Sequence, residues 1–313
     1  MITVYYKKNL QQDRDFHVLW EQVIDQLKLH TDEIQVVESG TANIESFGTM
    51  EIFDCELLLN YNGKFKGISL SDYHSDISNF FAVGTRDLVG EVRTEDDTLL
   101  IAQGSSPYQI WSEENTKNFV KCKVLGGIYT PQAPHINFEQ FRIPRDSKEI
   151  IDKFVFKGNV TGLPRKVVPY LENCQYYSGT DTYNMMEYLE VVSRYKVGLC
   201  IPGAGEICHR DIEYMAMGVP MLKFEYMANL SPKLIPNVHY ISIPRIDTHP
   251  FEGERSGGQK YADLYIQRFL EVKDDKEFLQ FISKNAMEYY DTYLRPENRV
   301  RHIFKLWELP FYE

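Results

Sequence analysis

The sequence lacks an excess of positive charge and a long apolar run. Its 34 Lys and Arg stand against 45 Asp and Glu, which gives a net charge of −11. This charge argues against a nucleic-acid partner, because phosphate contacts need Lys and Arg in excess. No stretch approaches the roughly 18 apolar residues of a membrane span, and the start MITVYYKKN has no apolar signal region. We therefore expect a soluble chain with no transmembrane segment that is not exported.

Cysteine is scarce and follows no pattern. The five cysteines are scattered along the chain at Cys55, Cys122, Cys174, Cys200 and Cys208. No two of them have CxxC spacing, so neither a zinc site nor a disulfide framework is indicated. We expect reduced, mostly buried thiols, a cytoplasmic location and no bound metal.

Short β-rich runs alternate with segments of helical period along the whole chain, which is typical of α/β architecture. The strands predicted in the first half are 2–6, 33–39, 55–61, 66–71, 98–103 and 123–129. Those predicted in the second half are 154–160, 174–178, 196–203, 219–224 and 239–243. Two long helical segments, 260–272 and 277–294, are predicted near the end of the chain.

The connector 137–153 holds Pro144 and several charges but little apolar periodicity, so we place a domain boundary near residue 145. This predicts an N-terminal domain over 1–145, a second domain over 146–295 and a tail over 296–313. The tail carries three basic residues that we expect on a solvated helix face, Arg299, Arg301 and Lys305. Two such halves indicate two Rossmann-like domains facing across a cleft, with ligands at the carboxyl ends of the strands.

The stretch GAGEICHRDIEYMAMGVP (203–220) contains His-Arg-Asp, the tripeptide of a protein-kinase catalytic loop. A kinase loop carries an Asn five residues after its Asp, to hold magnesium. Here Asp211 is followed at that distance by Ala216, so the match is accidental. Gly203 and Gly205 instead follow a predicted strand, and small residues there let a ligand approach the backbone closely.

A helix beginning near Glu206 would direct free N–H groups and its positive dipole end toward such a ligand. Glu206, Arg210 and Glu213 are spaced i, i+4, i+7 and share one face of this helix. An Arg in the first turn of this helix can neutralise the charge of a diphosphate, and a carboxylate one turn further can accept hydrogen bonds from ribose hydroxyls. The alternative is a solvated polar face with i,i+4 pairing.

A second candidate loop is KGNVTGLPR (157–165), which follows a predicted strand. It supplies four residues suited to binding an anion, Gly158, Thr161, Gly162 and Arg165. Glycine-rich turns after strands are common, so this loop alone is weak evidence. Two such loops in one half of the chain, each at a strand end, are better evidence.

Four stretches together resemble the donor-binding half of GT-B glycosyltransferases, and most closely the exostosin and CAP10-like (protein O-glucosyl/xylosyltransferase) groups. They are FVFKGNVTGLPR, KVGLCIPGAGEICHRDIEYMAMGVPMLKF, PNVHYISI and NAMEYYDTYLRPEN, over roughly 154–300. The resemblance implies a nucleotide-sugar donor such as UDP-xylose or UDP-glucose, with Arg165 and Arg210 on its diphosphate and Glu213 on its ribose. It also implies a last helix that crosses back to the first domain, docked by Phe304 and Trp307.

The spacing of the two Glu bears on the stereochemistry of transfer. Retaining GT-B enzymes often carry two Glu with seven residues between them, whereas six lie between Glu206 and Glu213. The resembling groups are mostly inverting, and an inverting enzyme needs a base near the acceptor hydroxyl. The stretch SLSDYHSDISNFF offers Asp72, His74 and Asp76 after a predicted strand. Asp76 is the first choice of base and Asp72 the second, although a capping or turn role for Asp72 remains open.

The function predicted from these features is transfer of a hexose or pentose from a nucleoside diphosphate to a glycan or glycosylated acceptor. The nucleotide sugar is a co-substrate, and neither a cofactor nor a metal is expected. Asp13-Arg14-Asp15 matches the Asp-x-Asp of metal-dependent transferases, but it precedes a surface helix and no strand supports it. Two alternatives remain open: a UDP-sugar epimerase on the same fold, and a non-catalytic nucleotide-sugar-binding protein.

Overall fold

The chain forms two compact units in the computed structural model. The first unit comprises Met1–Ile128, Ala228–Ser231 and Pro296–Glu313, and the second comprises Tyr129–Met227 and Pro232–Arg295. The structure describes residues 2–7, 23–29, 34–39, 55–61, 64–69, 99–102, 123–127, 136–158, 167–179, 181, 183–201, 208–226, 232–245, 258–306 and 309–312.

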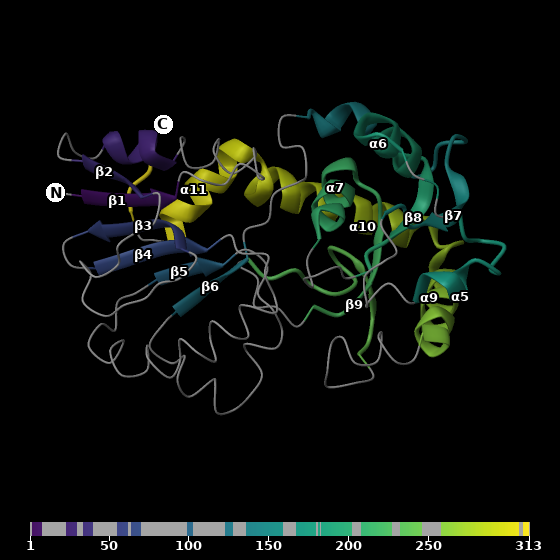
Figure 1. The fold of residues 1–313 in the computed structure, drawn as a ribbon. Helices are drawn as coiled ribbons and strands as arrows, with labels where there is room; N and C mark the ends of the chain where they lie inside the picture. Colours follow the sequence, from purple (N-terminus) through teal and green to yellow (C-terminus); the bar gives the residue numbers. More distant parts are fainter. Residues whose placement is uncertain are drawn as a thin grey trace. The chain divides into compact units, whose positions relative to one another are not determined.

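The first unit contains a six-stranded mixed sheet in the order β2-β1-β3-β4-β5-β6 (Figure 1). Its strands are β1 (Ile2–Lys7), β2 (Ile34–Ser39), β3 (Cys55–Tyr61), β4 (Lys64–Ser69), β5 (Leu99–Ala102) and β6 (Lys123–Gly127). The six strands predicted for this half are confirmed, with their ends displaced by up to two residues. β3 runs antiparallel to both neighbours, and all other pairs are parallel. The two residues that separate β3 from β4 in sequence are Asn-Gly, the pair most typical of a tight hairpin.

The last helix, α11 (Pro296–Leu306), belongs to the first unit, as predicted (Figure 1). Beyond it, the backbone N–H of Tyr312 donates to the side-chain carbonyl of Gln26 at 3.4 Å. Phe304 is fully buried and packs edge-on against Phe311, with ring centroids 5.9 Å apart. Trp307, the other predicted docking residue, lies outside the described residues.

One prediction for α11 is wrong. Arg299 is only 1% exposed, whereas Arg301 and Lys305 lie on the exposed side as expected. Arg299 stands four residues before the buried Ile303 and therefore lies on the same side of the helix. Arg299 was predicted to be exposed because it is charged. Its position relative to the apolar residues of the helix instead places it on the buried side.

The second unit contains a parallel four-stranded sheet in the order β10-β9-β8-β7. The strands are β7 (Ile151–Val155), β8 (Tyr195–Leu199), β9 (Met221–Phe224) and β10 (Ile241–Ile243). Its helical elements are η3 (Phe138–Phe141), α5 (Val168–Leu171), α6 (Met185–Ser193), α7 (His209–Met217), α9 (Gly258–Val272), α10 (Lys276–Tyr289) and the π-helical turn η5 (Tyr290–Leu294). The α/β class predicted for the chain is therefore confirmed. The strand predicted at 174–178 is reduced to one bridge, between Tyr177 and Phe154.

Successive side chains of a strand point to opposite faces of this sheet, and different helices pack on each face. Phe224 of β9 packs edge-on against Tyr261 and Tyr265 of α9, with ring centroids 5.3 and 5.1 Å apart. Lys223, its neighbour in sequence, points to the opposite face and contacts Asp211 of α7. In Figure 1, α5 and α9 lie together on one side of the sheet, and α6, α7 and α10 lie on the other.

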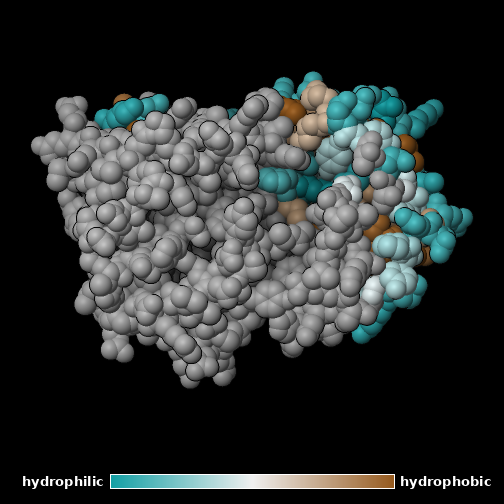
Figure 2. Space-filling model, in the orientation of Figure 1, coloured by the Kyte–Doolittle hydropathy of each residue, from teal (hydrophilic) through white to brown (hydrophobic). Residues whose placement is uncertain are grey.

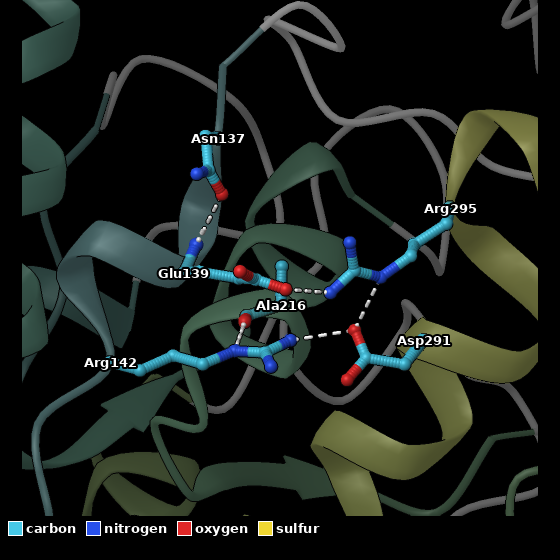
Figure 3. Close-up of polar contacts among 6 residues, drawn as sticks. All are labelled: Asn137, Glu139, Arg142, Ala216, Asp291 and Arg295. Carbon is cyan, nitrogen blue, oxygen red and sulfur yellow. Dashed lines mark hydrogen bonds and ion pairs between the residues drawn. The ribbon is translucent and has the colours of Figure 1, made fainter.

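The segment predicted as a linker is part of the second unit (Figure 3). Arg142 donates through Nε to the carbonyl of Ala216 at 2.8 Å and through Nη2 to Asp291 at 2.7 Å. Arg295 donates to the same Asp291 oxygen at 2.8 Å and forms an ion pair with Glu139. These contacts tie the start of the unit to its last residue. The two compact units divide at Ile128–Tyr129, before this segment, whereas the predicted boundary lies near residue 145.

None of the helices that the structure describes is both long enough and apolar enough to cross a bilayer. On the face drawn in Figure 2, hydrophilic residues cover most of the coloured surface, and hydrophobic residues form separate spots. Single exposed apolar side chains of this kind are ordinary on protein surfaces.

Candidate functional site

The described part of the predicted site lies at the carboxyl edge of the second sheet. Because β7, β8 and β9 are parallel, the segments that follow them meet at this edge. Lys157 and Gly158 follow β7, α7 follows β8, and Tyr226 follows β9. Residues far apart in sequence are therefore neighbours here.

Arg210 reaches from the first turn of α7 to the end of β7. Its Nη2 donates to the backbone carbonyl of Lys157 at 2.7 Å. The guanidinium carbon lies 4.2 Å from the centroid of the Phe156 ring, which gives a stacked cation–π contact. The side chain is buried, with the residue only 8% exposed. One face of the guanidinium is thus covered by an aromatic ring, and one nitrogen is fixed by the backbone.

Gly158 is required for this arrangement. A Cβ atom at position 158 would stand 2.2 Å from Nη2 of Arg210, far inside van der Waals contact. The absence of a side chain therefore lets Arg210 approach the Lys157 carbonyl. The structure brings together Gly158 and Arg210, which the sequence placed in two separate candidate loops.

The remaining nitrogens of Arg210 lack acceptors. Nε and Nη1 are buried and have no hydrogen-bond partner among the residues that the structure describes. The guanidinium stays protonated, and buried donors without acceptors are costly and rare. An anionic ligand with several oxygen atoms would satisfy both nitrogens and neutralise the charge.

Glu213 lies one turn further along α7 and is only 2% exposed. Its neighbours include two tyrosines, the half-buried Tyr188 of α6 and the fully buried Tyr214 of α7. Burial, followed by the charges of Tyr214 and Glu213, raises the pKa of the Tyr188 phenol well above its usual value. The alternative of a solvated polar face therefore fails for both Arg210 and Glu213.

α7 begins at His209 rather than near Glu206. The cause is Asp211, whose Oδ2 accepts from the backbone N–H of Cys208 at 3.2 Å and caps the helix there. The same oxygen accepts from Lys223 Nζ at 2.7 Å and from the Tyr226 hydroxyl at 3.0 Å. The Asp of the His-Arg-Asp tripeptide is thus a fully buried structural residue. It fixes the start of α7 against the end of β9.

Sequence reasoning missed two charged residues of this edge. Lys223 is fully buried inside the apolar strand β9, and Lys157 is 3% exposed directly after the apolar run FVF. A lysine inside or immediately after a buried strand is itself a signal, because Lys is almost never buried unless it is paired. That signal was available in both stretches.

Nine predicted site residues lie outside the described residues. On the donor side these are Thr161, Gly162, Arg165, Gly203, Gly205 and Glu206, and on the acceptor side Asp72, His74 and Asp76. Their roles stay predictions.

No protein-family model matches the sequence, and no curated protein matches it. Among solved structures, the chain is similar to sucrose-phosphate synthase from Thermosynechococcus elongatus, with 15% identity over 78% of this chain and 67% of that one and a TM-score of 0.44. It is similar to a glycosyltransferase from Rickettsia africae ESF-5, with 9% identity, 96% and 83% coverage and a TM-score of 0.42. A third likeness is to WaaG, a glycosyltransferase involved in lipopolysaccharide biosynthesis, with 12% identity, 96% and 98% coverage and a TM-score of 0.41.

Proposed function

We propose that this chain is a glycosyltransferase of the GT-B type that binds the diphosphate of a nucleotide sugar at the carboxyl edge of its second sheet. The observation that carries the proposal is the buried guanidinium of Arg210, two of whose nitrogens find no acceptor among the described residues. A diphosphate supplies both the negative charge and the acceptor oxygens that this group needs. The resemblance of the surrounding motifs to donor-binding halves supports the same ligand.

In this proposal, the donor-side residues bind different parts of the nucleotide sugar. Arg210 binds the diphosphate, and the missing side chain at Gly158 keeps the guanidinium in reach of it. Glu213, one helical turn further, accepts from the ribose hydroxyls. The remaining predicted donor residues complete the two loops, namely Thr161, Gly162, Arg165, Gly203, Gly205 and Glu206. We propose UDP as the nucleotide, with xylose or glucose as the sugar, and the exostosin or CAP10-like groups as the nearest kin.

We propose inversion at the sugar, with a base from the first unit. The acceptor hydroxyl oxygen attacks the anomeric carbon, its proton passes to the base, and the bond to the departing diphosphate breaks with its electron pair. Asp76 is the first candidate for the base, followed by Asp72 and then His74. Asp76→Asn should lower turnover by about 10²–10⁴-fold, the usual cost of losing a general base, without changing UDP affinity. A loss of only two- or threefold would exclude Asp76, and a large loss in Asp72→Asn instead would assign the base to Asp72.

The decisive assay begins with a panel of nucleotide sugars tested for thermal stabilisation, because a bound ligand raises stability by mass action. Sugars that stabilise the protein are then offered together with glycan acceptors, in EDTA, since we propose a transferase that needs no metal. Transfer to an acceptor supports the proposal. Conversion of a UDP-sugar without any acceptor would favour the epimerase, and binding without turnover would favour a binding protein. Activity that needs added manganese would contradict the metal-independent mechanism.

A further inference from the structure

Lys157 stands beside the candidate diphosphate site, and a lysine there would ordinarily be taken for a phosphate ligand. Its ammonium group is already committed. Nζ donates to the backbone carbonyls of Ser178 and Gly179 at 3.1 and 2.9 Å and to the carboxylate of Asp181 at 3.0 Å. A lysine ammonium has three N–H donors, so these three acceptors use its full capacity. The side chain is only 2% exposed, which leaves it little access to a ligand in solution.

The backbone of the same residue holds Arg210. The carbonyl of Lys157 is the acceptor for Nη2 of Arg210. The side chain of Lys157 therefore anchors the end of β7 to the segment 178–181, while its carbonyl orients the guanidinium. Electrostatic neighbours of Tyr177 include both Arg210 and Asp181, which places the two ends of this chain of contacts near one residue.

Asp181 completes the anchor from the solvent side. Its side chain is 70% exposed, so removing its charge leaves no cavity in the core. The hydrogen bond from Lys157, and after it the charge of that lysine, lowers the pKa of the Asp181 carboxyl. The carboxylate is therefore ionised at neutral pH and can hold the ammonium.

We infer that Lys157 and Asp181 are positioning residues for Arg210: they fix the carbonyl that aims the guanidinium at the diphosphate, and Lys157 does not itself bind the ligand. This inference rests on the proposed function. It predicts the direction in which one substitution changes the affinity for an anion. If Lys157 bound the diphosphate, Asp181 would compete for it, and Asp181→Asn would strengthen anion binding. If Lys157 positions Arg210, Asp181→Asn weakens anion binding.

The experiment is calorimetric titration of the full chain with UDP and, separately, with inorganic diphosphate. We expect Asp181→Asn to weaken both by about three- to tenfold, the scale of one net hydrogen bond, and Asp181→Glu to restore most of the loss. The weakening should persist in about 0.5 M salt, where screening removes the long-range repulsion between an exposed carboxylate and the anion. Lys157→Met should weaken binding further.

The matched control is Asp152→Asn. Asp152 forms an ion pair with Lys196 across β7 and β8, and its side chain is likewise exposed, but it lies at the other end of β7. This control should leave UDP affinity unchanged.

The outcomes separate the two claims. Tighter or unchanged binding by Asp181→Asn, with the wild type binding UDP, overturns the positioning role and leaves the proposed function standing. If the wild type binds neither UDP nor diphosphate, the proposed function fails and the inference fails with it. Should Lys157→Met not fold, the exposed Asp181 variants still decide the question.

Discussion

Arg210 is the side chain on which the proposed function depends. A guanidinium is seldom buried without acceptors, because the cost of an unsatisfied charged donor exceeds that of an ordinary lost hydrogen bond. One nitrogen is fixed by the Lys157 carbonyl, and the ring of Phe156 covers one face. The remaining donors are what distinguishes this residue from a structural arginine such as Arg145, which donates to the carbonyls of Ile143, Ser193 and Tyr195.

Gly158→Ala tests whether the position of Arg210 matters. The added methyl group would collide with the flexible end of Arg210 rather than with backbone, so we expect the guanidinium to move and the fold to persist. UDP affinity should fall by about tenfold or more, because a charged hydrogen bond is worth about 1.5–3 kcal/mol. Titration calorimetry gives the affinity, and a melting temperature close to the wild type serves as the control. Unchanged affinity would show that the guanidinium does not meet the ligand.

Residue types and strand ends were enough to predict two loops at one edge of the sheet, and the structure brings Gly158 and Arg210 together there. They were not enough to predict Lys157 or Asp181. These two residues are 24 positions apart, and no local period relates them, because the parallel bridge between Phe154 and Tyr177 brings them together. A contact made by sheet pairing leaves no trace in the spacing of its two residues.

Charged side chains from other elements hold both ends of helix α7, and the sequence of the helix alone does not predict these contacts. At its start Asp211 forms an ion pair with Lys223 of β9, and both side chains are almost fully buried. At its end Gly218 adopts a left-handed conformation, with φ 70°, and the Arg142 guanidinium donates to the carbonyl of Ala216. The helix is thus clamped to the sheet on one side and to η3 on the other, which fixes the residues it carries.

Lys223→Met tests the clamp at the start of α7. Removing one partner leaves the Asp211 carboxylate buried without its counter-ion, and we expect a loss of about 3–5 kcal/mol in the free energy of unfolding. The double variant Lys223→Met/Asp211→Asn removes that charge too and should lose less than the sum of the two single variants. Chemical denaturation of the four proteins measures this. Strict additivity would contradict a direct interaction between the two side chains.

His239 gives its segment a dependence on pH. Its Nδ1 accepts from the backbone N–H of Ile235 at 2.9 Å, which requires an unprotonated nitrogen, and burial lowers the pKa of the ring. The unfolded chain therefore binds a proton at higher pH than the folded one. Stability should fall as pH drops below the usual histidine pKa of about 6.5. Melting temperatures between pH 7 and 5 measure the slope, and His239→Asn should flatten it. An equal slope in both proteins would assign the effect elsewhere.

Two predicted element boundaries involve charges whose partners lie in other elements. The connector around 145 was predicted from Pro144, its charges and its weak apolar periodicity, and the helix start near Glu206 from the glycines that follow a predicted strand. Arg142 and Asp211 are paired, with Asp291 and with Lys223 respectively. Hydrophobic period predicts strands well because burial of apolar surface is local to the strand. Pairing of charges depends on partners from other elements.

At the scale of the whole molecule, the predicted base residues belong to the first unit and the predicted donor-binding residues to the second. The second unit carries a parallel sheet whose carboxyl edge brings together Gly158 and Arg210, two of the predicted donor-binding residues, and the first carries a mixed sheet with β3 antiparallel to its neighbours. The pattern of strands and helices predicted both α/β units, and the resemblance to GT-B enzymes implied that the last helix belongs with the first unit. The Asn-Gly pair that separates β3 from β4 in the sequence is typical of a tight hairpin, in keeping with the antiparallel pairing of these two strands.

The most direct test of the account is the affinity of UDP for Arg210→Met compared with Arg145→Met. Both variants replace an arginine with an uncharged side chain of similar length, but Arg145 bonds to Tyr195 at the amino end of β8. We predict that Arg210→Met weakens UDP binding at least tenfold, on the scale of about 1.5–3 kcal/mol for a charged hydrogen bond, and keeps the fold. Arg145→Met should lower stability and leave UDP affinity unchanged. Equal UDP affinity in Arg210→Met and the wild type would contradict the proposal that this guanidinium binds the donor diphosphate.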